Sequence, residues 1–196
     1  MFRAIGDILL RKLVVLLRVI AGTAKGRKFD TLSGLDTRPT LDRVRESVFG
    51  MLQFEIVGRA VLDLFAGSGG MGIEALSRGA SSAVFCGQSP ECAAIIKSNL
   101  KHLNLNGEVL CNDFEKCLSM LEASGKRFDF VFIDPPYASD FVDRATSFLE
   151  KSELLNNGAC IVIEHPKDRI PAIPDGLVLR ADRKYGKAHI RMLRKE

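Results

Sequence analysis

Apolar and polar residues alternate in blocks along most of the chain, and the blocks have two lengths. Short runs rich in Val, Ile, Phe and Leu predict buried strands at Ala60–Phe65, Ser82–Cys86, Glu108–Asn112, Phe128–Asp134 and Ala159–Glu164. The segments between them repeat apolar residues at helical spacing and predict helices at Gly70–Ser77, Pro90–Leu103, Phe114–Ala123 and Phe141–Leu149. Near-continuous apolar strands that alternate with helices predict an α/β fold, with a parallel sheet covered on both faces.

The end of the chain departs from this alternation. Two further strands, Leu177–Ala181 and Ala188–Leu193, follow each other without a full helix between them. Consecutive strands with a short connection pair antiparallel, so we expect a hairpin at one edge of the sheet.

The sequence of the first third of the chain predicts a smaller unit that packs on this core. Arg18–Ala21 and Lys25–Phe29 suggest a hairpin that turns at Gly22. Thr40 is a predicted N-cap, and a helix with outward-facing arginines follows it. We therefore divide the chain into an extension of unknown order (1–17), a hairpin and helix (18–58) and the main domain (59–196).

Composition and charge narrow the class of protein. The 196 residues carry a net charge of +4, but residues 1–45 carry +6, residues 180–196 carry +5 and the rest carries −7. Basic ends around an acidic body suggest that the ends bind a polyanion, although solvated charged tails are the alternative. Five cysteines without a CxxC pair and three scattered histidines predict no metal site. The longest apolar run near the start, Leu13–Leu17, is too short to cross a bilayer, and we expect a cytoplasmic protein without a membrane partner.

A glycine-rich turn follows the first strand of the main domain. The stretch from Val61 to Gly70 reads as a strand, a turn containing Gly67, Ser68 and Gly69, and a helix start. Glycines let a ligand approach the backbone, and a helix N-terminus offers free N–H groups. The turn lacks the Lys-Ser/Thr of a Walker loop, and Asp63 just before it favours a ligand with a cationic amine, such as S-adenosylmethionine. A purely structural turn is the alternative.

Two other strand ends carry candidate chemistry. Asp134-Pro135-Pro136-Tyr137 forces an abrupt exit from a strand and presents a carboxylate, free carbonyls and an aromatic ring. Such a group can accept the N–H bonds of a planar amine while the ring stacks on it, or it can be a structural turn. Asp113 can accept a bond from an adenine amine, or cap the helix that follows it, or both.

The combination of strand ends is more specific than any one of them. The segment Asp63–Gly69 resembles the cofactor loop of class I methyltransferases, and Asp134–Tyr137 resembles their amino-methylating motif. Arg18–Gly22, Lys25–Arg27 and above all Thr37–Glu46 resemble the signature of the bacterial 16S rRNA guanine-N2 methyltransferases of the RsmD type. This resemblance implies a seven-stranded, mostly parallel sheet whose last strand is antiparallel. It also implies methyl transfer from S-adenosylmethionine to the exocyclic N2 of a guanine in 16S rRNA, on an assembled or assembling 30S subunit. We expect the protein to be a monomer.

The resemblance also implies roles for individual residues. Asp134 and the Pro135 carbonyl would hold the guanine amine, and Tyr137 would stack on the base. The cofactor would lie against Asp134 and against a set that surrounds the turn: Asp63, Phe65, Ala66, Gly67, Ser68, Gly69 and, for the adenine, Asp113. Phosphates of the RNA would meet the basic residues of the first unit: Lys25, Arg27, Lys28, Arg38, Arg43 and Arg45.

One departure from the family pattern concerns the cofactor's ribose. Most class I methyltransferases end the second strand of the sheet with an acidic residue, whereas Gly87 stands there in this chain. We expect weaker cofactor binding without loss of activity. The alternatives to rRNA methylation are adenine-N6 methylation of DNA or RNA, glutamine methylation of a protein, and a non-catalytic RNA-binding assembly factor on the same fold.

Overall fold

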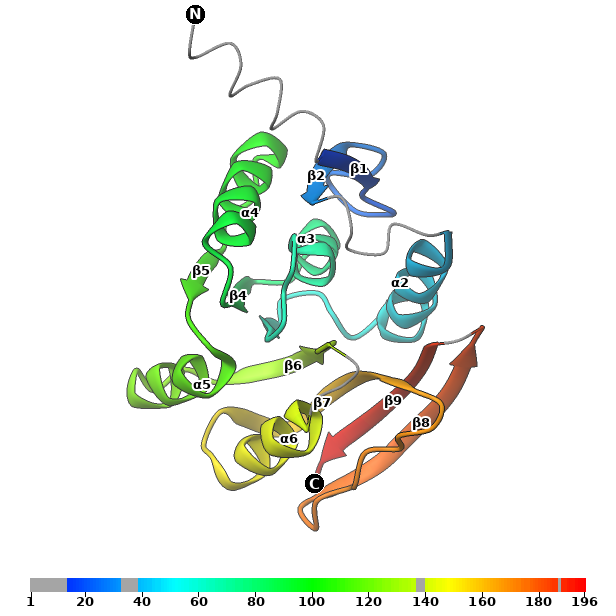
Figure 1. Cartoon of the computed structure of the whole chain (residues 1–196), viewed down its shortest axis with the longest axis vertical. Coiled ribbons are helices and arrows are strands. Elements are labelled where there is room, and N and C mark those ends of the chain that lie inside the picture. The colour runs from blue at the N-terminus through cyan, green and yellow to red at the C-terminus, as the bar shows by residue number, and fades with distance from the viewer. Residues whose placement is uncertain (1–13, 33–38, 137–139, 187) are drawn as a thin grey trace, which may run out of the picture.

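A seven-stranded sheet forms the centre of the computed structural model, which describes residues 14–32, 39–136, 140–186 and 188–196. The strands lie in the order β5-β4-β3-β6-β7-β9-β8; β3 to β7 are parallel, and β9 is antiparallel to both β7 and β8. Figure 1 shows β8 and β9 side by side at one edge. Their bounds are β3 Ala60–Asp63, β4 Ser82–Gly87, β5 Glu108–Cys111, β6 Phe128–Ile133, β7 Leu155–Pro166, β8 Leu177–Tyr185 and β9 Ala188–Lys195.

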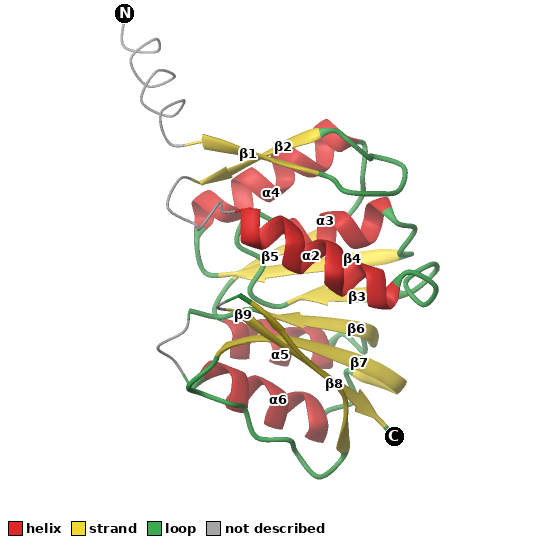
Figure 2. Ribbon diagram, turned by 90° about the vertical axis from the view of Figure 1, so that its right-hand side faces the viewer, coloured by secondary structure: helices red, strands yellow, loops and turns green. Residues whose placement is uncertain are grey.

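Helices cover both faces of this sheet. One buried cluster joins a sheet face to α2, α3 and α4, and a second joins the other face to α5 and α6. Figure 2 shows these layers, with α2, α3 and α4 on one side of the strands and α5 and α6 on the other. The bounds are α2 Pro39–Leu52, α3 Gly70–Ser77, α4 Pro90–Leu103, α5 Phe114–Ala123 and α6 Phe141–Lys151. The predicted α/β class and the antiparallel last strands are confirmed.

Strand boundaries differ most from the prediction in β7. This strand begins at Leu155, four residues before the predicted start, although Asn156, Asn157 and Gly158 are polar or flexible. Leu155 pairs with Phe128 across a register shift in the β6–β7 ladder, so the early residues are held by pairing rather than by apolar burial alone. No helix in the described part of the chain is long and apolar enough to cross a membrane.

The N-terminal hairpin forms, but its strands are not those predicted. They are β1 Val14–Arg18 and β2 Lys28–Leu32, so the predicted strand Arg18–Ala21 was wrong. The backbone N–H groups of Ile20 and Ala21 donate to the buried carboxylate of Glu74 on α3, at 2.8 and 3.0 Å, which takes them out of any strand ladder. The connection between β1 and β2 is thereby anchored to α3.

Helix α2 begins at Pro39, one residue before the predicted N-cap Thr40. Proline suits the first helical position because its fixed φ is helical and its missing N–H would have no partner there. Val44, Val48 and Leu52 are buried in the same cluster as α3 and α4, so the helix packs on the core as expected.

Candidate functional site

The carboxyl ends of β5, β4, β3 and β6 lie next to one another, so the residues at these ends share one edge of the sheet. Asp113 follows β5, Gly87 ends β4, Asp63 ends β3 and Asp134 follows β6. In parallel sheets this edge is where ligands bind. The structure brings the three predicted carboxylates to this edge in the order Asp113, Asp63, Asp134, with the glycine-rich turn that follows Asp63 between the other two.

The turn between β3 and α3 is tight, and backbone groups rather than side chains line it. Gly67 and Gly69 have φ of 52° and 89°, the left-handed region that favours glycine. The Ala66 N–H donates to the Cys86 carbonyl at 2.9 Å, which fixes the turn against β4. Gly69 has no side chain to cap α3, and the Gly72 N–H is bonded to Asp63, so the N–H groups of Gly70 and Met71 are the part of the first turn suited to an anion.

Asp63 lies beneath this turn with only 4% of its surface exposed. Its carboxylate accepts the Gly72 N–H at 2.9 Å, which ties the strand to α3. Burial raises the pKa of Asp63 to about 7, because the loss of solvent outweighs the stabilising Gly72 bond. A cation close to this carboxyl would shift it toward the charged form.

The N-terminal hairpin contacts the same turn through Asn99 on α4, whose side chain is 2% exposed. The Asn99 amide accepts the Asp30 N–H at 2.9 Å and donates to the Asp30 carbonyl at 2.8 Å and to the Ser68 carbonyl at 3.4 Å. The hydroxyls of Thr31 and Ser68 also form a hydrogen bond. We call these four residues (Asp30, Thr31, Ser68 and Asn99) the hairpin–turn bridge.

The chain leaves the sheet at Asp134, and Pro135 and Pro136 follow directly in the sequence. Each proline fixes φ and lacks an N–H, so the chain cannot continue the ladder with β7 here. Pro135 is buried, whereas Asp134 is exposed at the edge of the sheet. Tyr137, the predicted stacking ring, lies outside the described residues.

The electrostatics of Asp134 depend on two neighbouring acids. Desolvation of its carboxyl group, followed by the negative charges of Glu164 and Asp63, raises the pKa of Asp134 well above its ordinary value. A carboxylate with a raised pKa binds a proton more readily than an ordinary aspartate.

Asp113 and Gly87 occupy the far half of the edge. Asp113 caps α5, because its carboxylate accepts the Lys116 N–H at 2.9 Å; its contact with adenine stays a prediction. A Cβ added to Gly87 would meet no atom within 4 Å. The position where an acidic side chain is expected is therefore open.

Phe65 lies toward the other face of the sheet. Its ring centroid is 5.3 Å from that of Phe114 and 6.1 Å from that of Phe141, on α5 and α6. The ring thus belongs to an aromatic cluster, while its backbone stays beside the turn.

Four of the basic residues predicted to bind RNA are exposed: Lys25, Arg27 and Lys28 in the hairpin region and Arg43 on α2. Arg38 lies outside the described residues. Lys25 lies within the connection that is anchored to α3 and Lys28 directly follows it, so both lie on a well-fixed surface.

Arg27 and Arg45 both donate hydrogen bonds to other parts of the protein, although Arg27 is exposed and only Arg45 is buried. Arg27 donates to the Leu103 carbonyl at 2.9 Å and so neutralises the C-terminal end of α4. Arg45 is only 5% exposed; it donates to the Arg18 carbonyl at 2.6 Å and lies over the Phe29 ring. The expectation that the α2 arginines face outward was wrong for Arg45, because the hairpin covers it.

Sequence reasoning missed Glu164 and Asn99 at this edge. Glu164 ends the apolar run of β7 and is 9% exposed. The signal that could have found Glu164 is an acidic residue at the end of a buried strand, as at Asp63. Asn99 carries no comparable signal, since it lies within an ordinary amphipathic helix.

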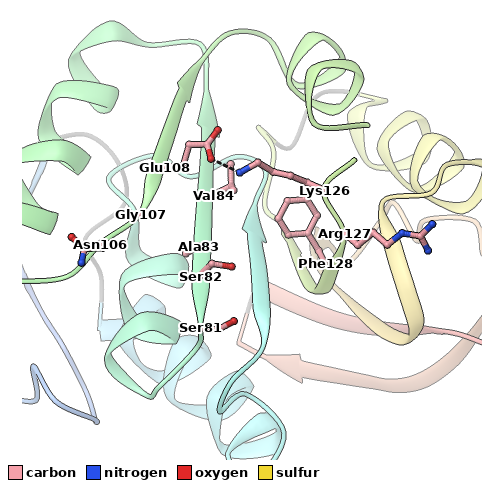
Figure 3. A pocket seen from close by; sticks show the side chains of 10 residues that line it. All are labelled: Ser81, Ser82, Ala83, Val84, Asn106, Gly107, Glu108, Lys126, Arg127 and Phe128. Carbon is pink, nitrogen blue, oxygen red and sulfur yellow. Dashed lines mark hydrogen bonds and ion pairs between the residues drawn. The ribbon is translucent and has the colours of Figure 1, made fainter. Parts of the chain in front are cut away.

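A pocket of about 440 Å³ lies at the opposite edge of the sheet, near the amino ends of β4 and β6. Figure 3 shows the Lys126–Glu108 ion pair at this pocket, with Arg127 pointing away from it. It is separate from the edge that holds Asp63 and Asp134. Within the described ranges, no group of three His, Cys, Asp or Glu residues is placed to hold a metal ion.

Comparison with known proteins places the chain in a family. The family model described as "Conserved hypothetical protein 95" matches residues 17–194. YlbH of Bacillus subtilis is 36% identical over 182 residues, which span 91% of this chain and 99% of that protein. Ribosomal RNA small subunit methyltransferase D of Haemophilus influenzae is 35% identical over 171 residues, which span 86% of this chain and 89% of that enzyme. The solved structure of YhhF from Escherichia coli has a TM-score of 0.82 at 32% identity and covers 93% of this chain and 99% of that one. The chain therefore belongs to the ribosomal RNA small subunit methyltransferase D family.

Proposed function

We propose that this protein transfers a methyl group from S-adenosylmethionine to the exocyclic N2 of a guanine in 16S rRNA, within the assembled or assembling 30S subunit. The observation that carries the proposal is the adjacency of β3 and β6. It joins the glycine turn after Asp63 to the Asp134-Pro135-Pro136 exit at one edge of the sheet. A methyl donor and an amine acceptor need this arrangement, because the reacting atoms must meet.

The residues at this edge fit S-adenosylmethionine, which supplies a methyl group on a sulfonium. The uncapped start of α3 suits the carboxylate of its methionine part. The buried carboxyl of Asp63 suits the amine, whose charge would favour ionisation of Asp63. The open space at Gly87 leaves room for the ribose but offers no side chain to hold it.

The proposed role of Asp134 follows from the chemistry of the amine. The lone pair of guanine N2 is delocalised into the purine, so the nitrogen is a weak nucleophile. Asp134 and the Pro135 carbonyl would accept its two N–H bonds and aim the lone pair at the methyl group. Asp134 would then take the proton that the nitrogen loses, and Tyr137 would stack on the base, which must leave its own stack to enter the site.

Transfer of a labelled methyl group tests this proposal. Small subunits from a strain that lacks the modification should accept label in the presence of S-adenosylmethionine, and digestion should release it as N2-methylguanosine. Label in adenosine or protein would favour the alternative substrates. Absence of label in every substrate, with RNA binding retained, would favour an assembly factor.

Charge reversal at Lys25 and Lys28 is expected to weaken rRNA binding and to lower the slope of log K against log salt by about two, because each lysine neutralises about one phosphate. Filter binding at several salt concentrations measures the slope. Reversal at Lys116 and Lys151, exposed on α5 and α6, is the matched control. An unchanged slope in the hairpin variant would exclude this surface.

Replacement of Gly87 with aspartate is expected to tighten S-adenosylmethionine binding about tenfold, because a carboxylate at the end of β4 would accept hydrogen bonds from the ribose. The space around Gly87 admits the side chain without displacement of a neighbour. Calorimetric titration measures the affinity, with Gly50→Asp on α2, another open glycine position, as the control. Unchanged affinity would mean that the ribose is held elsewhere.

A further inference from the structure

A second carboxyl group lies beside Asp134 on the neighbouring strand. Strands β6 and β7 are parallel, and their last pair in register is Ile133 with Ile163. The next residues, Asp134 and Glu164, therefore follow side by side. Side chains alternate along a strand, so Glu164 within β7 lies on the same face as Val162, and Asp134 directly follows the last residue of β6.

The two carboxyl groups have different surroundings. Glu164 is 9% exposed, whereas Asp134 is exposed at the edge where the amine would bind. Asp63, on the other side of β6, shares the same face. Neighbouring carboxylates repel each other, so such a pair holds one proton more tightly than either group alone. The raised pKa of Asp134, to which the charge of Glu164 contributes, agrees with this.

Other charged groups also approach Glu164. It lines a small pocket together with Asp143 of α6, Arg169 and His165, and Pro135 lies at the same pocket. The Asp143 carboxylate accepts the Ala172 N–H at 3.2 Å. On β9 the residue paired with Glu164 is the apolar Ile190. Asp143, His165 and Arg169 are therefore the titratable or charged side chains that share this pocket with Glu164.

We propose that Glu164 is a positioning residue that acts through Asp134, making Asp134 a stronger acceptor for the proton released on methylation. This rests on the proposed function. In the step, the N2 lone pair forms a bond to the methyl carbon while the carbon–sulfur bond breaks and leaves its electron pair on sulfur. One N–H proton then passes to the Asp134 carboxylate. Uptake of this proton relieves the repulsion between Asp134 and Glu164.

Glu164→Gln separates this role from a structural one. The rate of transfer should rise with pH as Asp134 loses its proton. Removal of the Glu164 charge should shift the midpoint of this acid limb of the pH profile of kcat to a pH that is lower by about one unit or more. The plateau rate should fall about tenfold, because Asp134 becomes a weaker base. Glu164→Asp keeps the charge and should keep the acid limb of the native enzyme, and Glu122→Gln, exposed on α5, should change neither quantity.

The outcomes distinguish the two proposals. Native enzyme that does not methylate guanine N2 overturns the proposed function. Native activity with an unmoved acid limb in Glu164→Gln overturns the role of Glu164 alone, even where the rate falls. If circular dichroism shows that Glu164→Gln does not fold, a carbon-13 NMR titration of the Asp134 carboxyl group in the native protein tests the role of Glu164 instead. A raised, two-step titration of Asp134 supports the inference, and a single step near the ordinary aspartate value overturns it.

Discussion

Replacement of Asp134 with alanine is expected to lower methyl transfer by about 10²–10³-fold or more, with a modest change in cofactor affinity. The variant loses both the acceptor that orients the amine and the group that takes its proton, and removal of one preorganised partner in a site of this kind has effects of that size. Single-turnover transfer of labelled methyl to small subunits measures the rate, and calorimetry measures cofactor binding.

Two comparisons make the Asp134 result decisive. Asp168→Ala removes an exposed carboxylate from the loop after β7 and should leave the rate unchanged. Near-native activity in Asp134→Ala would overturn the proposal that Asp134 holds the guanine amine. A matching loss of cofactor affinity would assign Asp134 to cofactor binding instead.

The second large effect concerns stability and arises from Asp63. Its pKa rises from 3.8 in the unfolded chain to about 7 in the folded protein. Between these values the folded state holds a proton that the unfolded state has lost, so the free energy of unfolding falls as pH rises. The fall is complete above pH 7 and amounts to about 4 kcal/mol, since one pKa unit corresponds to about 1.4 kcal/mol.

Asp63→Asn is expected to remove this penalty. The asparagine oxygen can still accept the Gly72 N–H, but the side chain carries no charge to bury. The stability difference between the variant and the native protein should therefore grow in favour of the variant from pH 4 to about pH 8, and then stay constant. Urea unfolding at four pH values measures it, with the exposed Asp175→Asn as control. A difference that does not change with pH would mean that Asp63 titrates as an ordinary aspartate.

The parts of the fold that could be predicted from sequence are those that local patterns decide. Runs such as Phe128–Ile133 are apolar enough to require burial, and the glycine turn and Pro135-Pro136 mark where the chain must leave the sheet. These signals also place Asp63 and Asp134 at strand ends. The edge of the sheet that holds the candidate site follows from them.

The features that could not be predicted depend on residues far apart in the chain. Ile20 and Ala21 leave the strand conformation because Glu74, more than fifty residues away, accepts their N–H groups. Arg45 is polar on a helix and yet buried, because the hairpin packs over it. Glu164 reaches Asp134 only through the register of β6 and β7, which no local pattern encodes.

The hairpin–turn bridge has a thermodynamic consequence for an enzyme with two substrates. It joins the surface proposed to hold RNA to the loop proposed to hold the cofactor, through Thr31, Ser68 and Asn99. A ligand that orders either side stabilises the other, and linkage requires the effect to be equal in both directions. Each substrate would then raise the affinity for its partner by the same factor. Ribosomal RNA would then act as an activator of cofactor capture.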